Sequence, residues 1–154
     1  RCLAIGFPAR VISKYPDFPK ELSDQDKVAI FRKMIQEMAR FFVGSGCQCV
    51  QDGDRLEVRE SPHGWLRRRG RRWLMYVSDG HVHEAVERLP SETFHVFLSL
   101  REIPDDVRRS LESRGVVWIE IARKERSRLS NELGENVFQF IKRYGVRTLR
   151  EPRA

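Results

Sequence analysis

The chain has 154 residues, about the length of one domain, with 40% hydrophobic and 33% charged residues. This composition is typical of a globular protein and excludes a disordered one, and no apolar run approaches the roughly 18 residues of a membrane-spanning helix. Lys and Arg number 29 against 22 Asp and Glu, and 23 of the 29 are arginine. Because a guanidinium matches a phosphate with paired hydrogen bonds, the net charge of +7 favours a polyanionic partner. Codon usage or adaptation to high temperature is the alternative explanation.

The three cysteines are too few for a disulfide framework, so we expect reduced thiols and a cytoplasmic location. Cys47-x-Cys49 and His81-x-His83 have the residue types of a zinc site. Their spacing matches no common zinc module, and buried thiols are ordinary core residues. We therefore assign no metal ligands to them.

The first half of the chain predicts one long helix followed by two strands. Residues 1–22 contain three prolines and predict an edge strand or an extended arm. Ser23 is a plausible N-cap, and from Val28 to Phe42 apolar residues recur at spacings of three and four, which predicts a helix that ends at the glycines 44 and 46. Residues 47–50 and 56–60 then predict short strands joined by a turn at Asp52 and Gly53.

The second half predicts alternating strands and helices. Residues 61–70 form a connection rich in arginine and turn formers, and 72–78 predict an apolar strand that completes a basic hairpin. A short helix at 81–89, a strand at 95–100, a helix from Pro104 to Gly115 and a strand at 116–121 follow. The last two strands should lie parallel with a right-handed crossover. A final helix is expected at 130–144.

This order predicts an α/β fold with a mixed central sheet flanked by helices. We expect an N-terminal arm or edge strand at 1–22, an α/β core at 23–122, and a basic C-terminal helix and tail at 123–154 packed on the same domain. No catalytic triad and no glycine-rich phosphate loop is recognisable from spacing.

The run HVFLSLREIPDDVRRSLESRGVVWIEIA, residues 95–122, resembles the late β-α-β unit of the restriction-endonuclease-like superfamily, the PD-(D/E)XK nucleases. The order of elements over residues 24–121 is similar to that family as well. The resemblance implies a restriction-endonuclease-like scaffold that contacts DNA.

Members of this family carry an acid on one meander strand and a Glu-x-Lys pair on the next, where the acids bind a divalent cation. The resemblance puts Glu57 about where the first acid stands, with Asp54 and Glu60 as substitutes. On the next strand Tyr76 and Ser78 stand where Glu and Lys are expected, so the motif is incomplete. The expectation is a non-cleaving, pseudo-nuclease member. The alternative is an active Mg²⁺-dependent nuclease whose candidate ligands are those three acids.

The arginines of the hairpin are the candidate phosphate contacts, with Trp65 as a stacking platform for an unpaired base. They are Arg67, Arg68, Arg69, Arg71 and Arg72. Trp73 is expected in the core or on the sheet. The predicted function is nucleic-acid binding, DNA more than RNA, within a nucleic-acid-processing complex. A third hypothesis is a structural or protein-interaction subunit whose basic surface meets an acidic protein.

Overall fold

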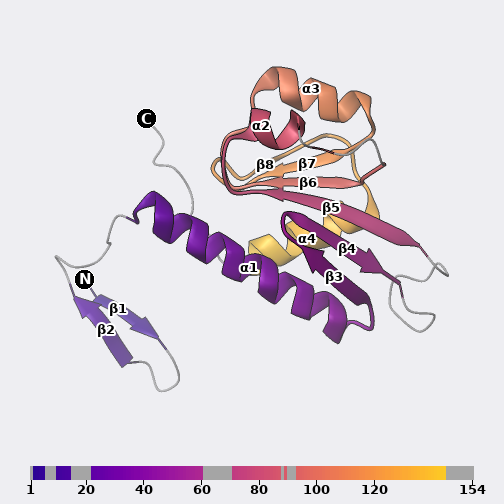
Figure 1. The fold of residues 1–154 in the computed structure, drawn as a ribbon. Coiled ribbons are helices and arrows are strands. Elements are labelled where there is room, and N and C mark those ends of the chain that lie inside the picture. The colour runs from indigo at the N-terminus through magenta and orange to yellow at the C-terminus, as the bar shows by residue number, and fades with distance from the viewer. Residues whose placement is uncertain are drawn as a thin grey trace.

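The computed structural model describes residues 2–5, 10–14, 22–60, 71–87, 89 and 93–144. Near the start, β1 (Cys2–Ile5) and β2 (Arg10–Lys14) pair antiparallel in a sheet of their own (Figure 1). The elements that follow are α1 (Asp24–Gly44), β3 (Gln48–Asp52), β4 (Arg55–Arg59), β5 (Arg72–Ser78), α2 (Val82–Glu87), β6 (Val96–Ser99), α3 (Asp105–Ser113), β7 (Val117–Glu120), β8 (Glu125–Arg126) and α4 (Glu132–Tyr144).

The main sheet has six strands in the order β3-β4-β5-β6-β7-β8. β3, β4 and β5 form an antiparallel meander, β5, β6 and β7 run parallel, and β8 returns antiparallel to β7. The predicted α/β class, with a mixed sheet flanked by helices, is confirmed. Among the described residues no helix combines the length and the apolar character that crossing a membrane requires.

The helices cover the two faces of the sheet unequally (Figure 1). α1 and α4 pack on one face against side chains of β4, β5, β6 and β7, such as Leu56, Met75 and Leu98. α2 and α3 lie on the other face, where they pack against residues of β5, β6 and β7 such as Phe97 and Trp118. That second cluster contains no residue of β3 or β4. One side of the meander is therefore not covered by any described helix.

The predicted start of the first helix is confirmed. The Ser23 hydroxyl accepts a hydrogen bond from the Asp26 backbone N–H at 3.1 Å, and the Asp26 carboxylate accepts one from the Ser23 N–H at 3.2 Å. This reciprocal capping box satisfies backbone donors that a helix start leaves without partners. It fixes the residue at which α1 begins.

A buried ion pair joins α3 to the end of β7. The Glu120 side chain is inaccessible to solvent, and it accepts a hydrogen bond from the Arg108 guanidinium at 2.7 Å and one from the Ile103 N–H at 2.9 Å. The same guanidinium lies 4.7 Å from the ring centroid of Trp118, within cation–π range. These contacts pin the first half of α3 over the carboxyl end of β7.

The structure differs from the sequence-based expectations in three places. The N-terminal residues form a two-stranded sheet instead of a single strand or arm. The turn of the β3–β4 hairpin is Gly53–Asp54, because Gly53 takes the positive φ of 53° and Asp52 still pairs with Arg55. β8 was not expected, since a two-residue strand has no periodicity to recognise.

Core packing predicts a large difference between two leucines. Leu98 is fully buried in β6, whereas Leu129 is 39% exposed. Leu98→Ala should lower the free energy of unfolding by about 2–5 kcal/mol, because it removes buried methyl groups and leaves a cavity. Leu129→Ala is the matched control and should change it by less than about 1 kcal/mol. Urea unfolding followed by circular dichroism measures both, and equal losses would contradict the assigned core.

Candidate nucleic-acid interface

The uncovered side of the meander carries a cluster of charged side chains. Side chains alternate along a strand, so Arg55, Glu57 and Arg59 of β4 point to the same side. The register of β4 and β5 places Arg72 directly opposite Arg59. Three guanidinium groups and one carboxylate from two neighbouring strands therefore share one face. We call this set, Arg55, Glu57, Arg59 and Arg72, the arginine face.

Glu57 holds the arginine face together. Its carboxylate accepts hydrogen bonds from the Arg72 guanidinium at 2.8 Å and from Nε of Arg59, and a nitrogen of Arg55 lies 3.5 Å away. The hydrogen bonds from Arg72 and Arg59 lower the pKa of Glu57 to about 2, against an ordinary value of 4.5. The carboxylate is therefore charged at neutral pH and acts as the hub of three ion pairs.

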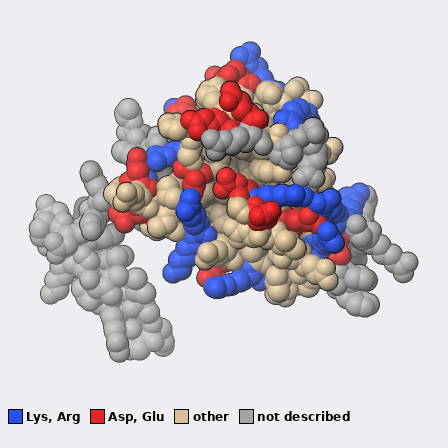
Figure 2. Space-filling view, viewed as in Figure 1, with Lys and Arg blue, Asp and Glu red and all other residues tan. Residues whose placement is uncertain are grey.

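The guanidinium groups of the arginine face are accessible to solvent, whereas the Glu57 carboxylate is buried. The side chain of Glu57 is 9% exposed, whereas those of Arg59 and Arg72 are 58% and 47% exposed. Three positive charges against one negative charge leave an excess of two. Figure 2 shows blue and red atoms side by side where Figure 1 draws β4 and the start of β5. Exposed guanidinium forks held in place by a buried carboxylate suit the binding of phosphate groups.

Of the predicted nucleic-acid contacts that the structure describes, Arg72 lies on this face and Arg71 does not. Arg71 is exposed, and its guanidinium carbon lies 5.7 Å from the ring centroid of Trp73, on the side of the sheet that α1 and α4 cover. Trp73 itself is buried, and its indole N–H donates to the Glu60 carboxylate at 3.0 Å, which confirms the expected core position. Trp65, Arg67, Arg68 and Arg69 lie outside the described residues.

The three candidate metal-binding acids do not come together. Asp54 is exposed in the β3–β4 turn. Glu57 lies in the middle of β4 on the arginine face, engaged by arginines. Glu60 follows the other end of β4 and is buried against Trp73, on the face that α1 and α4 cover. Among the described residues no group of three or more His, Cys, Asp or Glu side chains has an arrangement that could hold a metal ion.

Of these acids, Asp54 lies nearest to the positions where the resemblance expects Glu and Lys. Its carbonyl accepts a hydrogen bond from the Val77 N–H at 2.8 Å, between Tyr76 and Ser78. Asp54, Tyr76 and Ser78 line one cavity of about 320 Å³, together with Glu84. Ser78 is buried there and offers a hydroxyl in place of a lysine. The chemistry of the Glu-x-Lys pair has no equivalent at these two positions.

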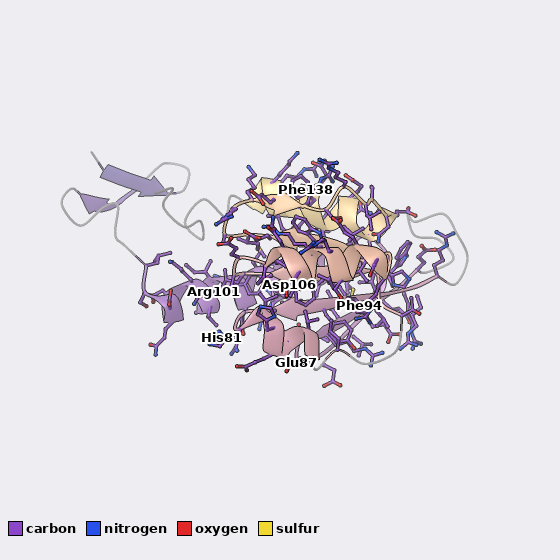
Figure 3. All side chains as sticks on the ribbon, turned by 90° about the horizontal axis from the view of Figure 1, so that it is seen from above. His81, Glu87, Phe94, Arg101, Asp106 and Phe138 are labelled. Carbon is purple, nitrogen blue, oxygen red and sulfur yellow. The ribbon has the colours of Figure 1, made fainter. Side chains whose placement is uncertain are left out.

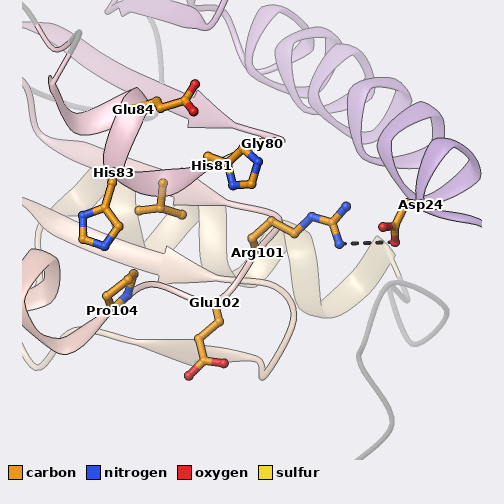
Figure 4. Close-up of a pocket in the computed structure, with 9 residues that line it drawn as sticks. Asp24, Gly80, His81, His83, Glu84, Arg101, Glu102 and Pro104 are labelled. Atoms are coloured by element: carbon orange, nitrogen blue, oxygen red, sulfur yellow. Dashed lines mark hydrogen bonds and ion pairs between the residues drawn. The ribbon is translucent and has the colours of Figure 1, made fainter.

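A larger cavity of about 720 Å³ lies beyond the carboxyl ends of β5 and β6 (Figure 4). Arg101 spans it to reach Asp24 of α1 at 3.3 Å, and this hydrogen bond lowers the pKa of Asp24. His81 and Arg101 lie at the same end of the molecule, opposite Phe94, in the view from above (Figure 3). The cavity walls also carry His83, Glu84 and Glu102, so that, with Asp24, three carboxylates stand against the single guanidinium of Arg101.

The cysteine and histidine pairs are far apart in the fold. Cys47 immediately precedes β3. The first residues of β3 and β5 lie at the same end of the sheet, because both pair with Arg59 of β4. His81 and His83 follow the other end of β5. Burial, with a smaller contribution from the charge of nearby groups, raises the pKa of both thiols, that of Cys49 to about 11. Neutral thiols are poor ligands and poor nucleophiles, so both act as core residues.

Two of the basic residues after β7 form ion pairs with acids. Arg123 contacts Glu102 at 2.7 Å, and Arg126 contacts Glu135 at 2.6 Å.

Two members of the arginine face, Arg55 and Arg59, were not predicted from the sequence. The signal that could have found them is the strict alternation of RLEVR, which puts all its charged residues on one side of a strand.

No family model, no curated protein and no solved structure matches this chain.

The low pKa of Glu57 predicts a pH-dependent contribution to stability. Because its pKa of about 2 in the fold lies below 4.5, the charged carboxylate stabilises the fold above pH 4.5. This contribution is lost as the pH falls from 4.5 towards 2. Glu57→Gln should therefore be less stable than the parent chain at neutral pH, and the difference should vanish near pH 2.

Urea midpoints measured across this pH range test that expectation. Glu37→Gln is the control, since Glu37 makes a single ion pair with the exposed Arg40. It should cost little at any pH. A stability difference for Glu57→Gln that stays constant down to pH 2 would show that the carboxylate gains nothing from its arginines.

Proposed function

We propose that the chain binds nucleic acid through the arginine face and the neighbouring basic hairpin. The observation that carries this proposal is that Arg55, Arg59 and Arg72 gather around one buried carboxylate on a sheet surface that no described helix covers. Guanidinium groups that converge on one point of the surface suit the binding of a backbone phosphate. The hairpin's residues 67–69 add three arginines by sequence, and Arg71 adds an exposed one on the side of the sheet where Trp73 lies.

A restriction-endonuclease-like scaffold remains part of the proposal, with DNA as the favoured ligand. Its support is the order of elements, a helix before a three-stranded meander followed by alternating helices and parallel strands, together with the resemblance over residues 95–122. Architecture alone does not determine function, so the charged surface carries the functional argument.

Binding without cleavage is the version we favour. Glu57 is held by arginines, Glu60 is buried against Trp73, and Asp54 lies apart from both. An active Mg²⁺-dependent nuclease would need carboxylates that converge on one cation. A structural subunit with an acidic protein partner is the other alternative, and it predicts no nucleic-acid binding at moderate salt.

Replacing Arg59 and Arg72 together by Ser should weaken oligonucleotide binding by tenfold or more. Each lost phosphate contact should reduce the slope of log affinity against log salt by about 0.9 on duplex DNA, so two contacts reduce it by about 1.8. Fluorescence anisotropy with single-stranded and duplex oligonucleotides over a salt series measures both quantities. Gel analysis of the same samples with Mg²⁺ detects cleavage.

The matched control replaces Arg40 and Arg109, two exposed arginines on helices, and removes the same charge. It should leave affinity and slope nearly unchanged. Melting curves of both double variants check that each remains folded. Equal losses of affinity in the two double variants would show that net charge, and not the arginine face, determines binding. If the parent chain bound no oligonucleotide even at low salt, the proposal would be overturned.

A further inference from the structure

The two edges of the six-stranded sheet differ in how they are protected. β8 is a strand of only two residues, and both of them, Glu125 and Arg126, are charged. β3, at the opposite edge, has five residues, contains no proline and carries one charge, Asp52. Proteins protect a free sheet edge with short strands, charges or proline, because an open edge is a template for another strand. β8 has such protection, and within the described part of the chain β3 does not.

The hairpin geometry determines which backbone groups of β3 point outward. Asp52 and Arg55 flank the two-residue turn and form its closing hydrogen-bonded pair, and hydrogen-bonded pairs recur at every second residue. The backbone of Val50, opposite Glu57, therefore faces β4. The N–H and C=O groups of Cys49 and Gln51 face away from the sheet, and no described group hydrogen-bonds to them.

An antiparallel pairing of β3 with a second copy of itself satisfies these outward groups in one register. If the two-fold axis passes through Val50, Cys49 lies opposite Gln51 of the second copy, and symmetry repeats this pair. Both residues of each pair direct their backbone groups across the seam. Gln48 lies opposite Asp52 of the second copy, an amide donor against a carboxylate. No like charges meet in this register.

Exposed apolar side chains flank the same edge. Val50 is 58% exposed and would meet its own symmetry mate. Phe41 of α1 contacts Phe140 of α4. Val43 lies two residues further along, which is a rotation of roughly 200° around the helix. Its side chain is 55% exposed. Val43 is thus on the flank of α1 that faces away from α4. Gln36, on that same flank, lines a cavity with Gln51 of β3.

We propose that the chain forms a symmetric homodimer by antiparallel pairing of β3 with β3 of a second copy, centred on Val50. The two-fold axis is perpendicular to the sheet, so equivalent faces of the two copies lie on the same side of the combined sheet. The arginine faces of both copies then lie on one continuous surface of a twelve-stranded sheet, since each copy supplies six strands. The proposal rests on the strand edge and is tested without nucleic acid, so its failure is distinguishable from failure of the proposed function.

Charge substitutions in β3 test the register in solution. Val50→Lys puts two ammonium groups opposite each other, and it should raise the dimer dissociation constant by about tenfold or more. Gln48→Lys adds the same charge but meets Asp52 of the second copy, so it should preserve or strengthen the dimer. Light scattering after size-exclusion chromatography over a dilution series measures the mass. Because each copy carries a net charge of +7, added salt should also strengthen the dimer.

A disulfide provides a second measurement. Val50 and its mate form a non-hydrogen-bonded pair, with Cα atoms about 4.5 Å apart, within the range that a disulfide spans. Val50→Cys should therefore yield a covalent dimer on oxidation. Gln48→Cys, which faces Asp52 instead of its own mate, should not exceed the parent chain.

Specific outcomes would overturn the proposed dimer. A parent chain that stays monomeric at every concentration and salt would do so. Equal weakening by the two lysine variants would refute the register, and so would equal cross-linking of the two cysteine variants. Melting curves and circular dichroism of each variant confirm that the monomer fold persists, because both positions are exposed.

Discussion

Alternation of side chains across β4 and β5 is the constraint on which both the core and the charged surface depend. β4 is five residues long, and it contributes Leu56 and Val58 to the core beneath it. The residues between and beside them, Arg55, Glu57 and Arg59, necessarily point the other way. A shift of one residue in the strand pairing would bury the charges and expose the core, so the hydrophobic side fixes the position of the arginines as well.

The ion pairs of Glu57 explain how several like charges can lie side by side on a sheet. Neighbouring guanidinium groups repel one another, and flexible arginines lose rotamer freedom when they are held in one geometry. A carboxylate at their centre offsets the repulsion and restricts the side chains before any ligand arrives. Its low pKa means that it neither donates nor accepts a proton at neutral pH, which fits an organising role.

Much of the fold followed from the sequence, and the arrangement of the charged surface followed only in part. Spacings of three and four predicted α1, and its capping residue Ser23 was identified correctly. Glu57 and Arg72 were singled out, but Glu57 as a metal ligand by resemblance. The ion pairs of Glu57 with arginines depend on the register of β4 and β5. They also depend on α2 and α3 leaving this side of the meander uncovered. Neither property is local, so neither could be read from periodicity.

The ion pair between Arg108 and Glu120 constrains how the sequence can change. Glu120 without Arg108 is a charge in a place where water does not reach, and such a loss costs about 3–5 kcal/mol. Arg108 without Glu120 is 18% exposed and keeps Glu125 and Asp105 as partners. Replacing both by apolar residues of similar size is far less costly. Losing Arg108 first is therefore the costly order of replacement, whereas losing Glu120 first leaves Arg108 with its other acids. Chains that descend from a common ancestor with this one should therefore keep Arg108 wherever they keep Glu120.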